Sequence, residues 1–353
     1  MVSKDQKSHA LALHKDALVV DFHCDGVLAT LPDSAYIIEG AVKRSLHERS
    51  DSGHVDIPRL IEGGVDCQVF SHFVEPLYNP IAPQRILQVL GYSLNEVEKS
   101  DKIGLVKNYD EIMKNKGKRL SFMIGFEGGE ALMNDLRLLK VYHTIGLRRL
   151  TLTWNNRNLI ADGVTWQKSG GGLTEFGADV VRECNRLGVI VDISHMTDQG
   201  VWDTLEASEM PIIASHSNCR ALCSHMRNLT DDMIKAIAEK DGVIGVNYVP
   251  FFLTDIDFKK FRSGDEAEKA KAESVTVETV VNHIDHMVEV IGDSKHIGLG
   301  SDFDGVPMIA KGLEDASKLP NLTISLCERG YSDEEIKAIL GENFLRVIKK
   351  ICG

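Results

Sequence analysis

The stretch VVDFHCDG, residues 19–26, ends a run of strand-forming residues with a histidine and an aspartate, His23 and Asp25. On a β-strand, residues two apart point to the same face, so both side chains can reach one point in space. Imidazole and carboxylate groups are ligands that divalent transition metals use in proteins. A pair of this kind also arises by chance at a strand end, so the rest of the chain has to decide between the two interpretations.

Other short apolar runs end in the same way, on a group that can hold a metal, a proton or a substrate. These groups are His72, Glu127, His195, His216 and Asp302. A random soluble sequence would scatter such groups over its surface helices. Their shared position at the ends of strand-like runs therefore indicates one site, whose histidines and carboxylates suit a metal such as zinc.

The number of ligands favours two metal ions over one. His23 and Asp25 suit one ion. His195 and His216 suit a second ion, and Glu127 suits a carboxylate that bridges the two. Two metals with a bridging hydroxide acidify water to a nucleophile at neutral pH and polarise a carbonyl at the same centre. A carboxylate at the tip of an apolar strand, as in GFEGGEA, is also costly to desolvate without a cation.

Eight short β-rich apolar runs recur along the chain, and longer segments with helical spacing separate most of them. The expected strands are 17–23, 65–73, 121–128, 147–154, 189–195, 211–216, 243–249 and 296–302. The clearest helical segments, each ending on a glycine, are 175–188, 231–242 and 277–292. Near-continuous apolar strands that alternate with helices indicate a parallel sheet. We therefore predict an α/β protein with a (β/α)8 TIM-like barrel, whose reactive face lies at the C-terminal ends of the strands.

No low-complexity tract or Pro/Gly-rich linker divides the chain, so one domain over residues 1–353 is the simplest organisation. Two insertions are expected over the C-terminal face of the barrel. Residues 33–58 lack clear periodicity. Residues 253–275 are strongly charged and form either a lid over the barrel mouth or ordinary solvated surface.

The net charge of -12 argues against nucleic acid or an anionic membrane as a partner, because both require a basic surface. The N-terminus has no apolar core of signal-peptide length, and no later stretch approaches the roughly eighteen apolar residues of a membrane span. A cytoplasmic location is therefore expected. Seven cysteines spread thinly over the chain indicate reduced thiols, with Cys219 and Cys223 as small buried side chains.

Five blocks of the sequence resemble the membrane (renal) dipeptidase family, the M19 metallopeptidases of the amidohydrolase superfamily. The blocks are HCDG, GFEGGEAL, GLTEFGADVVRECNRLGVIVDISH, IIASHSNCRALCSHMRNL and HIGLGSDFDGVP, in that order. The resemblance runs from about Val19 to about Leu345. It is specific because five separate blocks agree in order and spacing, and because many other amidohydrolases carry H-x-H where this chain has H-x-D.

The resemblance implies the same metal ligands as the strand-end pattern. In the family, the H-x-D pair binds one zinc, here His23 and Asp25, and the glutamate of the E-G-G block bridges, here Glu127. The histidines of the DISH and SHSN blocks bind the second zinc, here His195 and His216. The cofactors implied are two divalent metal ions, with zinc expected.

The resemblance also implies three further roles. Asp302, the first aspartate of SDFDG, matches the proton-transfer residue of the family, and Asp304 is expected to secure the loop. Arg227, eleven residues after His216, matches the arginine that holds the carboxylate of the substrate. The resemblance further implies small dipeptide substrates, including ones with a D-residue at the carboxyl side, and a homodimer.

One residue departs from the family pattern. After LTLT the mammalian members carry a histidine thought to contact the scissile carbonyl, whereas this chain has Trp154. Indole donates one hydrogen bond but neither accepts one nor titrates. Either the metals polarise the carbonyl alone, or Asn155 or Asn156 assists. Trp154 is alternatively an apolar wall for a substrate side chain.

The expected reaction is hydrolysis of the peptide bond of a dipeptide, in which Asp302 shuttles the proton to the leaving amine and Arg227 anchors the carboxylate. Long peptides are expected to be poor substrates, because only a free carboxylate near the scissile bond satisfies Arg227. Two alternatives stay open. One is another amide or lactam hydrolase, such as an N-acyl amino acid deacylase, and the other is a non-catalytic binding protein on the same barrel. The histidines expected to be structural are His47, His54, His143, His225, His283 and His286.

Overall fold

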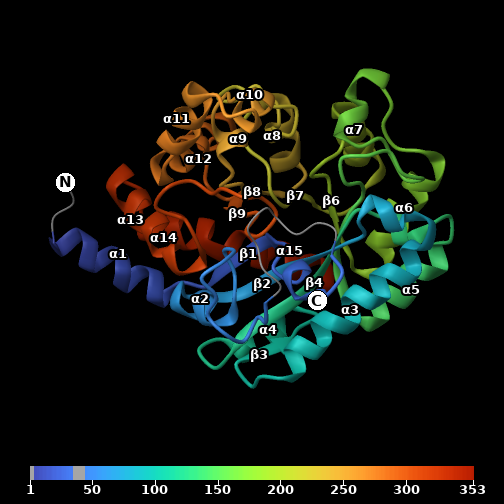
Figure 1. Cartoon of the computed structure of the whole chain (residues 1–353), viewed down its shortest axis with the longest axis horizontal. Coiled ribbons are helices and arrows are strands. Elements are labelled where there is room, and N and C mark those ends of the chain that lie inside the picture. Colours follow the sequence, from blue (N-terminus) through green and yellow to red (C-terminus); the bar gives the residue numbers. More distant parts are fainter. Residues whose placement is uncertain (1–3, 35–43) are drawn as a thin grey trace.

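The computed structural model describes residues 4–34 and 44–353, and a parallel sheet lies at its centre (Figure 1). Nine strands lie within these residues and pair in the order β2-β1-β9-β8-β7-β6-β5-β4-β3. They are β1 Val19–Cys24, β2 Val65–Phe73, β3 Ile103–Leu105, β4 Leu120–Glu127, β5 Leu147–Thr151, β6 Ile190–Asp192, β7 Ile212–Ala214, β8 Val243–Val246 and β9 Ile297–Leu299. β2 also pairs with β4, from Cys67 with Ser121 to Phe73 with Glu127. This pairing closes eight strands into a barrel and confirms the predicted (β/α)8 fold.

The strand that the sequence did not predict is β3. Its residues pair with Leu120, Ser121 and Phe122 at the start of β4, on the edge that β5 occupies from Ile124 onward. A strand of three residues is too short for a hydrophobic pattern to identify. β3 therefore extends the sheet beside the barrel and does not take part in its closure.

The strands are buried because helices cover the outer face of the barrel. Every residue of β4 is buried, as expected for a strand of a parallel sheet that is covered on both faces. Helix α15 (Asn343–Cys352) packs against β1, β6, β8 and β9. Its Phe344 ring stacks on Phe22 with the centroids 3.9 Å apart. The C-terminal helix thus fixes four of the strands on which the site depends.

Helices follow the strands as the sequence predicts. The other α-helices are α1 Lys4–Asp16, α2 Ile57–Glu62, α3 Ala82–Glu98, α4 Tyr109–Asn115, α5 Leu136–Ile145, α6 Glu175–Leu187, α7 Asp198–Ala207, α8 Asp231–Glu239, α9 Pro250–Leu253, α10 Phe258–Arg262, α11 Glu266–Ser274, α12 Val277–Ile291, α13 Pro320–Arg329 and α14 Asp333–Lys337. Shorter helical turns are η1 Leu28–Thr30, η2 Pro76–Ile81, η3 Glu130–Leu132, η4 Val164–Ser169, η5 Ala316–Lys318 and η6 Ala338–Glu342.

Two of the three predicted glycine stops are confirmed. Gly188 ends α6 and Gly292 ends α12, and each adopts the left-handed conformation that glycine tolerates best. α8 ends differently, because Lys240 follows its last residue and Asp241 takes the positive φ of 62°. The predicted stop at Gly242 is therefore wrong by one residue, and Asp241 turns the chain toward β8.

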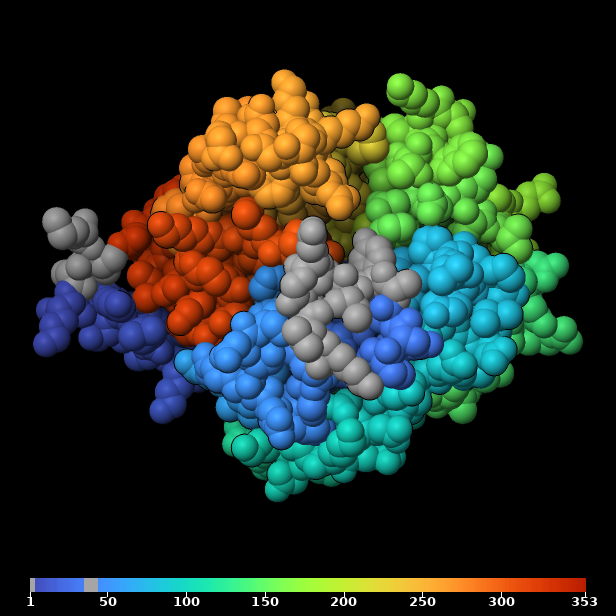
Figure 2. Space-filling model, in the orientation of Figure 1, coloured from blue at the N-terminus to red at the C-terminus, as the bar shows by residue number. Residues whose placement is uncertain are grey.

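The charged insertion, residues 253–275, contains α10 and α11. It lies at the molecular surface beside the C-terminal segments, coloured orange next to red in Figure 2. Ile256 and Phe258 of this insertion line the cavity at the barrel mouth, as its predicted position requires. Of the other predicted insertion, 33–58, residues 35–43 lie outside the described part of the chain. No helix among the described residues is long and apolar enough to cross a membrane.

Candidate active site

The structure brings the predicted ligands and the predicted proton-transfer residue together at the C-terminal ends of the strands. In chain order they are His23 in β1, Asp25 just after it, Glu127 at the end of β4, His195 after β6, His216 after β7 and Asp302 after β9. All six side chains are buried. Parallel strands of a barrel end at one rim, so residues far apart in the sequence meet there.

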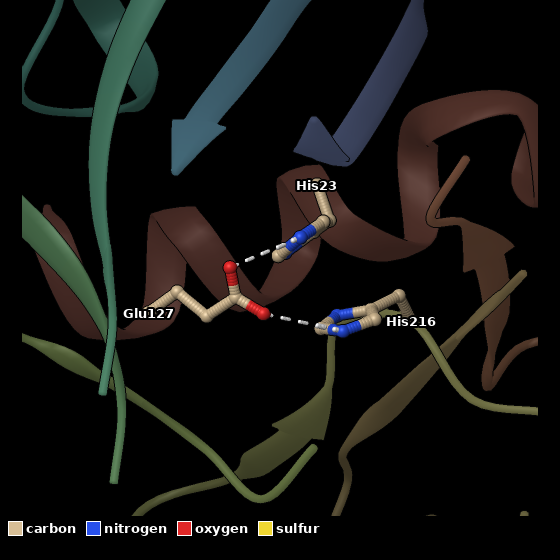
Figure 3. A group of neighbouring side chains, drawn as sticks. All are labelled: His23, Glu127 and His216. Atoms are coloured by element: carbon tan, nitrogen blue, oxygen red, sulfur yellow. Dashed lines mark ion pairs between the residues drawn. The ribbon is translucent and has the colours of Figure 1, made fainter. Parts of the chain in front are cut away.

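Glu127 lies at the centre of this cluster, with one oxygen turned toward His23 and the other toward His216 (Figure 3). Its Oε2 atom is 3.7 Å from His23 Nε2. Its Oε1 atom is 2.9 Å from His195 Nε2 and 3.8 Å from His216 Nε2. Asp25 Oδ2 lies 3.3 Å from His23 Nε2, on the Oε2 side. The cluster thus has two halves that share the Glu127 carboxylate.

The three histidines of the cluster turn their Nε2 atoms toward Glu127 and hold their Nδ1 atoms elsewhere. The Nδ1 partners are Ser71 Oγ at 3.0 Å for His23, Asn155 Oδ1 at 2.8 Å for His195 and Ser215 Oγ at 2.8 Å for His216. A hydrogen bond from Nδ1–H fixes the ring orientation and leaves the Nε2 lone pair free for a metal ion.

The half with His195 and His216 is rich in acceptors. Burial, followed by the charge of Arg227, lowers the pKa of His195 to about 4. Burial also lowers the pKa of His216 well below its usual value. Both rings are therefore neutral at pH 7, yet their Nε2 atoms lie 2.9 Å apart beside the Glu127 carboxylate. When both rings donate from Nδ1, two lone pairs and a carboxylate oxygen face one point, which a cation satisfies.

The half with His23 and Asp25 leaves polar atoms without partners. Among the described residues, His23 Nε2 and Asp25 Oδ1 are buried and make no hydrogen bond. Burial, with the neighbouring Glu127 carboxylate, raises the pKa of Asp25 to about 8. Although burial opposes it, Glu127 and Asp25 raise the pKa of His23 to about 9. A buried site that holds protons this tightly lacks positive charge, and a metal ion supplies it.

The ligand atoms lie close enough to share an ion. Atoms of His23, Glu127 and His216 lie within 4.8 Å of one another, and so do atoms of His23, Asp25 and Asp302. Nitrogen and carboxylate oxygen are the donors that zinc prefers. The donor set, the distances and the unpartnered atoms of the cluster therefore fit metal binding.

Asp302 lies at the edge of the cluster with one oxygen anchored. Asn247 Nδ2 donates to its Oδ2 atom at 2.9 Å, while Oδ1 lies 3.9 Å from His23 Nε2. Burial raises the pKa of this carboxyl group. Asp302 has a positive φ of 62° and His195 one of 73°, conformations that non-glycine residues rarely adopt and that concentrate at functional sites.

Asp304 secures a loop, as the sequence predicts. Its carboxylate accepts a hydrogen bond from His54 N at 2.6 Å and pairs with Arg44. Its own N–H donates to His54 Nδ1 at 3.0 Å. Asp304 thus ties the segment around residues 44–54 to the strand end that carries Asp302.

A cavity of about 450 Å³ opens beside the cluster. Asp25, Glu127, His195, Asp302 and Arg227 line it on the polar side. The apolar lining includes Leu28, Phe73, Trp154, Phe251, Phe252 and Phe258. A small molecule with one charged end and apolar side chains fits such a lining.

Arg227 lines this cavity as a buried cation. In the described part of the chain, its Nε and Nη2 atoms have no hydrogen-bond partner. Burial lowers the pKa of Arg227 to about 10, so the guanidinium group stays charged at neutral pH. A buried charge without a partner is costly, and a carboxylate from a ligand can pair with it through two parallel hydrogen bonds.

The chain matches the family described as membrane dipeptidase, peptidase family M19, over residues 7–352. The chain belongs to this family. Its members are metallopeptidases that act on dipeptides, and the cavity beside the cluster is the candidate for the peptidase site of this member. The alternative of a non-catalytic binding protein is therefore not supported.

Two curated relatives and one crystal structure are similar to this chain over most of its length. An uncharacterized dipeptidase of Schizosaccharomyces pombe is 35% identical over 314 residues, which cover 84% of this chain and 73% of the relative. Dipeptidase tcpJ of Claviceps purpurea is 34% identical over 314 residues, which cover 85% and 70%. A Rhodobacter sphaeroides metallopeptidase, liganded with a phosphinate mimic of L-Ala-D-Ala, is 26% identical with a TM-score of 0.79, covering 95% and 99%.

Trp154, where this family member departs from the histidine pattern, packs its ring 5.0 Å from that of Phe73 and lines the cavity. It therefore contributes apolar surface, as one of the two interpretations of the sequence expects. Asn155 also lines the cavity, but its Oδ1 accepts from His195. In this dipeptidase, the side-chain oxygen of Asn155 thus orients His195.

Two histidines lie elsewhere than the sequence suggests. His72, which ends an apolar run, turns away from the cluster and bonds Ser93 Oγ at 2.7 Å through Nε2. His225, expected to be purely structural, lines the cavity beside Arg227. Burial lowers the pKa of His225 to about 4, and its Nδ1 accepts from Arg227 N at 3.1 Å. His225 therefore supports the segment that carries the arginine.

Sequence reasoning missed the serines that hold two of the histidines. Ser71 stands immediately before His72, and Ser215 immediately before His216. A hydroxyl group next to a predicted ligand is a weak signal, because serine is common in loops and strands. Only the pairing of the strands shows which hydroxyl faces which ring.

Proposed function

We propose that this dipeptidase is a binuclear zinc enzyme that hydrolyses the peptide bond of dipeptides with a free carboxylate. The observation that carries the proposal is the two-sided cluster around Glu127 beside a cavity lined by Arg227. Among the described residues, the buried Nε and Nη2 atoms of Arg227 have no hydrogen-bond partner. The cluster offers the reactive centre, and the arginine offers the anchor for one end of a short substrate.

The five candidate ligands would divide between two ions. His23 and Asp25 would hold one ion, His195 and His216 would hold the other, and the Glu127 carboxylate would serve both. When bound, such a pair of ions supplies water acidified to a nucleophile and an electrophile for the scissile carbonyl. Ser71, Asn155 and Ser215 keep the three imidazole rings oriented for this task through their contacts with the Nδ1 atoms.

Asp302 acts as the proton shuttle. Its Oδ2 atom is held by Asn247, while Oδ1 faces the cluster and the cavity. Oδ1 takes the proton of the nucleophilic water and passes it to the leaving amine, as general acid–base catalysis requires. The carboxylate needs no movement of its backbone for this transfer, because the loop bonds of Asp304 hold the segment in place.

Arg227 selects substrates by their length. It pairs with the terminal carboxylate of the dipeptide and so compensates for its own burial. A longer peptide has an amide at this position, which leaves the guanidinium group unpaired. The dipeptide mimic bound by the Rhodobacter sphaeroides relative has a D-residue at its carboxyl side. This supports the proposal that L-D dipeptides are substrates here.

The apolar wall around Trp154 and Phe73 favours substrates with apolar side chains. The carbonyl of the substrate then depends on the metal ions for polarisation, because an indole ring offers only one N–H donor. This wall distinguishes the proposed pocket from one with a histidine at the same position.

The test is a panel of substrates with the zinc-loaded enzyme. We expect hydrolysis of L-L and L-D dipeptides and little or none of the same dipeptides with an amidated C-terminus. N-acyl amino acids are included because they also carry a free carboxylate. Turnover of N-acyl amino acids alone would assign the site to a deacylase, and equal turnover of amidated and free dipeptides would remove Arg227 from its role.

A further inference from the structure

A fully buried ion pair lies beneath the candidate metal site. Arg149 of β5 and Asp192 of β6 are 0% exposed, and Arg149 Nη1 lies 2.8 Å from Asp192 Oδ2. Thr151 Oγ1 donates to the same oxygen at 2.5 Å. Although burial acts to raise it, the charge of Arg149 and hydrogen bonds from Ser215 and Thr151 lower the pKa of Asp192 to about 2. A buried ion pair contributes little net stability on its own, which points to a second role for this pair.

On one side the pair contacts the half of the site that contains His23. Arg149 Nη2 donates to Ser71 Oγ at 2.6 Å, and Ser71 Oγ lies 3.0 Å from His23 Nδ1. The guanidinium group can only donate, so it occupies one lone pair of the hydroxyl oxygen. The remaining lone pair accepts from His23 Nδ1–H, which leaves His23 Nε2 available at the cluster.

The chain makes room for this arginine. A Cβ atom at Gly125 in β4 would lie 2.5 Å from Arg149 Nη2 and 2.6 Å from Nε. Gly125 pairs with Ser71 of β2 and with Arg149 of β5, so the absence of a side chain there lets the guanidinium group cross the face of β4. The contact between Arg149 and Ser71 depends on that space.

On the other side the pair contacts the half that contains His216. Ser215 Oγ lies 2.6 Å from Asp192 Oδ2 and 2.8 Å from His216 Nδ1. The ionised carboxylate only accepts, so the hydroxyl proton goes to Asp192. The oxygen of Ser215 then accepts from His216 Nδ1–H, which fixes the tautomer with the lone pair on Nε2. Ser215 N also donates to Asp192 Oδ1 at 2.9 Å.

We propose that the Arg149–Asp192 pair is a shared positioning element, which acts through Ser71 on His23 and through Ser215 on His216. The inference rests on the proposed function, because it assigns the two histidines to different metal ions. One ion pair thereby sets the ring orientation in both halves. Neither Arg149 nor Asp192 lines the cavity, so both are positioning residues.

The test measures zinc binding, not only activity. The two stepwise dissociation constants of Zn²⁺ are determined by competition with a chromophoric chelator for the wild type and for Ser71→Ala, Ser215→Ala and Asp192→Asn. Loss of an orienting partner typically weakens metal affinity about 10- to 100-fold. We expect Ser71→Ala to weaken one constant, Ser215→Ala to weaken the other, and Asp192→Asn to weaken both.

Glu75→Gln is the matched control, because Glu75 also pairs with a buried arginine, Arg85, at 2.8 Å. It should lower stability while both zinc constants stay as in the wild type. The serine variants keep the test informative if Asp192→Asn does not fold, since each removes one oxygen atom. The inference is overturned if both serine variants bind zinc like the wild type, if both weaken the same constant, or if Glu75→Gln weakens zinc binding equally. A wild type that binds no zinc overturns the proposed function instead.

Discussion

The buried charges around Arg85 and those around the cavity differ in how they are compensated. Arg85 on α3 donates hydrogen bonds to both carboxylate oxygens of Glu75, at 3.0 and 2.8 Å, and to the carboxylate of Asp33 at 3.0 Å. Arg227 at the cavity has Nε and Nη2 unpaired among the described residues, and His23 Nε2 is unpaired in the adjoining cluster. The first region is satisfied within the chain. The second leaves places for groups from outside, which is the property of a binding site.

This contrast predicts that removing the charge of Asp302 lowers catalysis without lowering stability. In Asp302→Asn, the side chain keeps its shape but can no longer take up a proton from water. We expect kcat to fall about 10²- to 10⁴-fold, the usual contribution of general acid–base catalysis, with zinc content and the unfolding midpoint unchanged. Steady-state kinetics, metal analysis and thermal unfolding check this. Unchanged kcat would remove Asp302 from its proposed role.

The two arginines should respond in opposite ways to replacement by methionine. Arg85→Met leaves Glu75 buried without its partner, and breaking a buried pair costs about 3–5 kcal/mol of unfolding free energy. Arg227→Met removes a buried charge whose Nε and Nη2 atoms have no hydrogen-bond partner among the described residues, so stability should not fall. Its kcat/KM for dipeptides should fall about 30- to 5,000-fold, which corresponds to about 2–5 kcal/mol of binding energy.

Denaturant unfolding and dipeptide kinetics on the two variants measure this double dissociation. Arg85→Met is expected to keep its kcat/KM at temperatures where it stays folded. The comparison breaks if Arg227→Met loses as much stability as Arg85→Met, because Arg227 would then have a structural partner. It also breaks if Arg85→Met is fully folded and inactive.

The strand-end pattern predicted which side chains meet in the cluster, because the barrel forces parallel strands to end at one rim. The orienting groups were not predictable, since they depend on which of two neighbouring residues faces the site. Ser71 and His72 show the difficulty, because alternation along β2 turns one toward His23 and the other toward Ser93. A shift of one residue would have exchanged them, and only the strand register decides.

The Arg149–Asp192 pair was hidden for a similar reason. The two residues are 43 positions apart, on consecutive strands whose pairing brings them together. In the sequence, Arg149 stands in LRRLT beside another arginine, with nothing to show which of the two pairs with Asp192. Periodicity predicts the fold and strand ends predict the candidate ligands, but hydrogen bonds across strands depend on three-dimensional pairing.

The half of the cluster with His23 and Asp25 should also make zinc binding depend on pH. In the metal-free protein the pKa of Asp25 is raised to about 8 and that of His23 to about 9, so the His23–Asp25 pair holds at least one proton at pH 7. Zinc must displace these protons, and its affinity should therefore rise with pH up to about these values. Each displaced proton gives about a tenfold change in affinity per pH unit.

Calorimetric titration of the metal-free protein at pH 7, in buffers of different ionisation enthalpy, counts the protons that zinc releases. We expect release of at least one proton per chain. Zinc binding without proton release would mean that the cluster is already ionised when it is metal-free, against the charge balance described for Asp25 and His23.

The smallest expected effect concerns the apolar wall. Trp154→Ala enlarges the cavity beside Phe73 without touching a charge, so it should leave zinc binding and stability nearly as they are. For dipeptides with large apolar side chains, we expect kcat/KM to fall about tenfold, the usual scale for hydrophobic pocket contacts. Dipeptides of glycine should show little change. An equal loss for both kinds of substrate would mean that Trp154 acts on the reaction and not on a side chain.

The central claim is that strand ends distant in the sequence converge to hold two cations on either side of Glu127. The most direct measurement is an anomalous difference map, collected at the zinc absorption edge from crystals of the zinc-loaded protein. We predict two peaks, one beside His23 and Asp25 and one beside His195 and His216, with a Glu127 oxygen directed at each. A map with no peak in this cluster, while the side chains are well ordered, would contradict the claim.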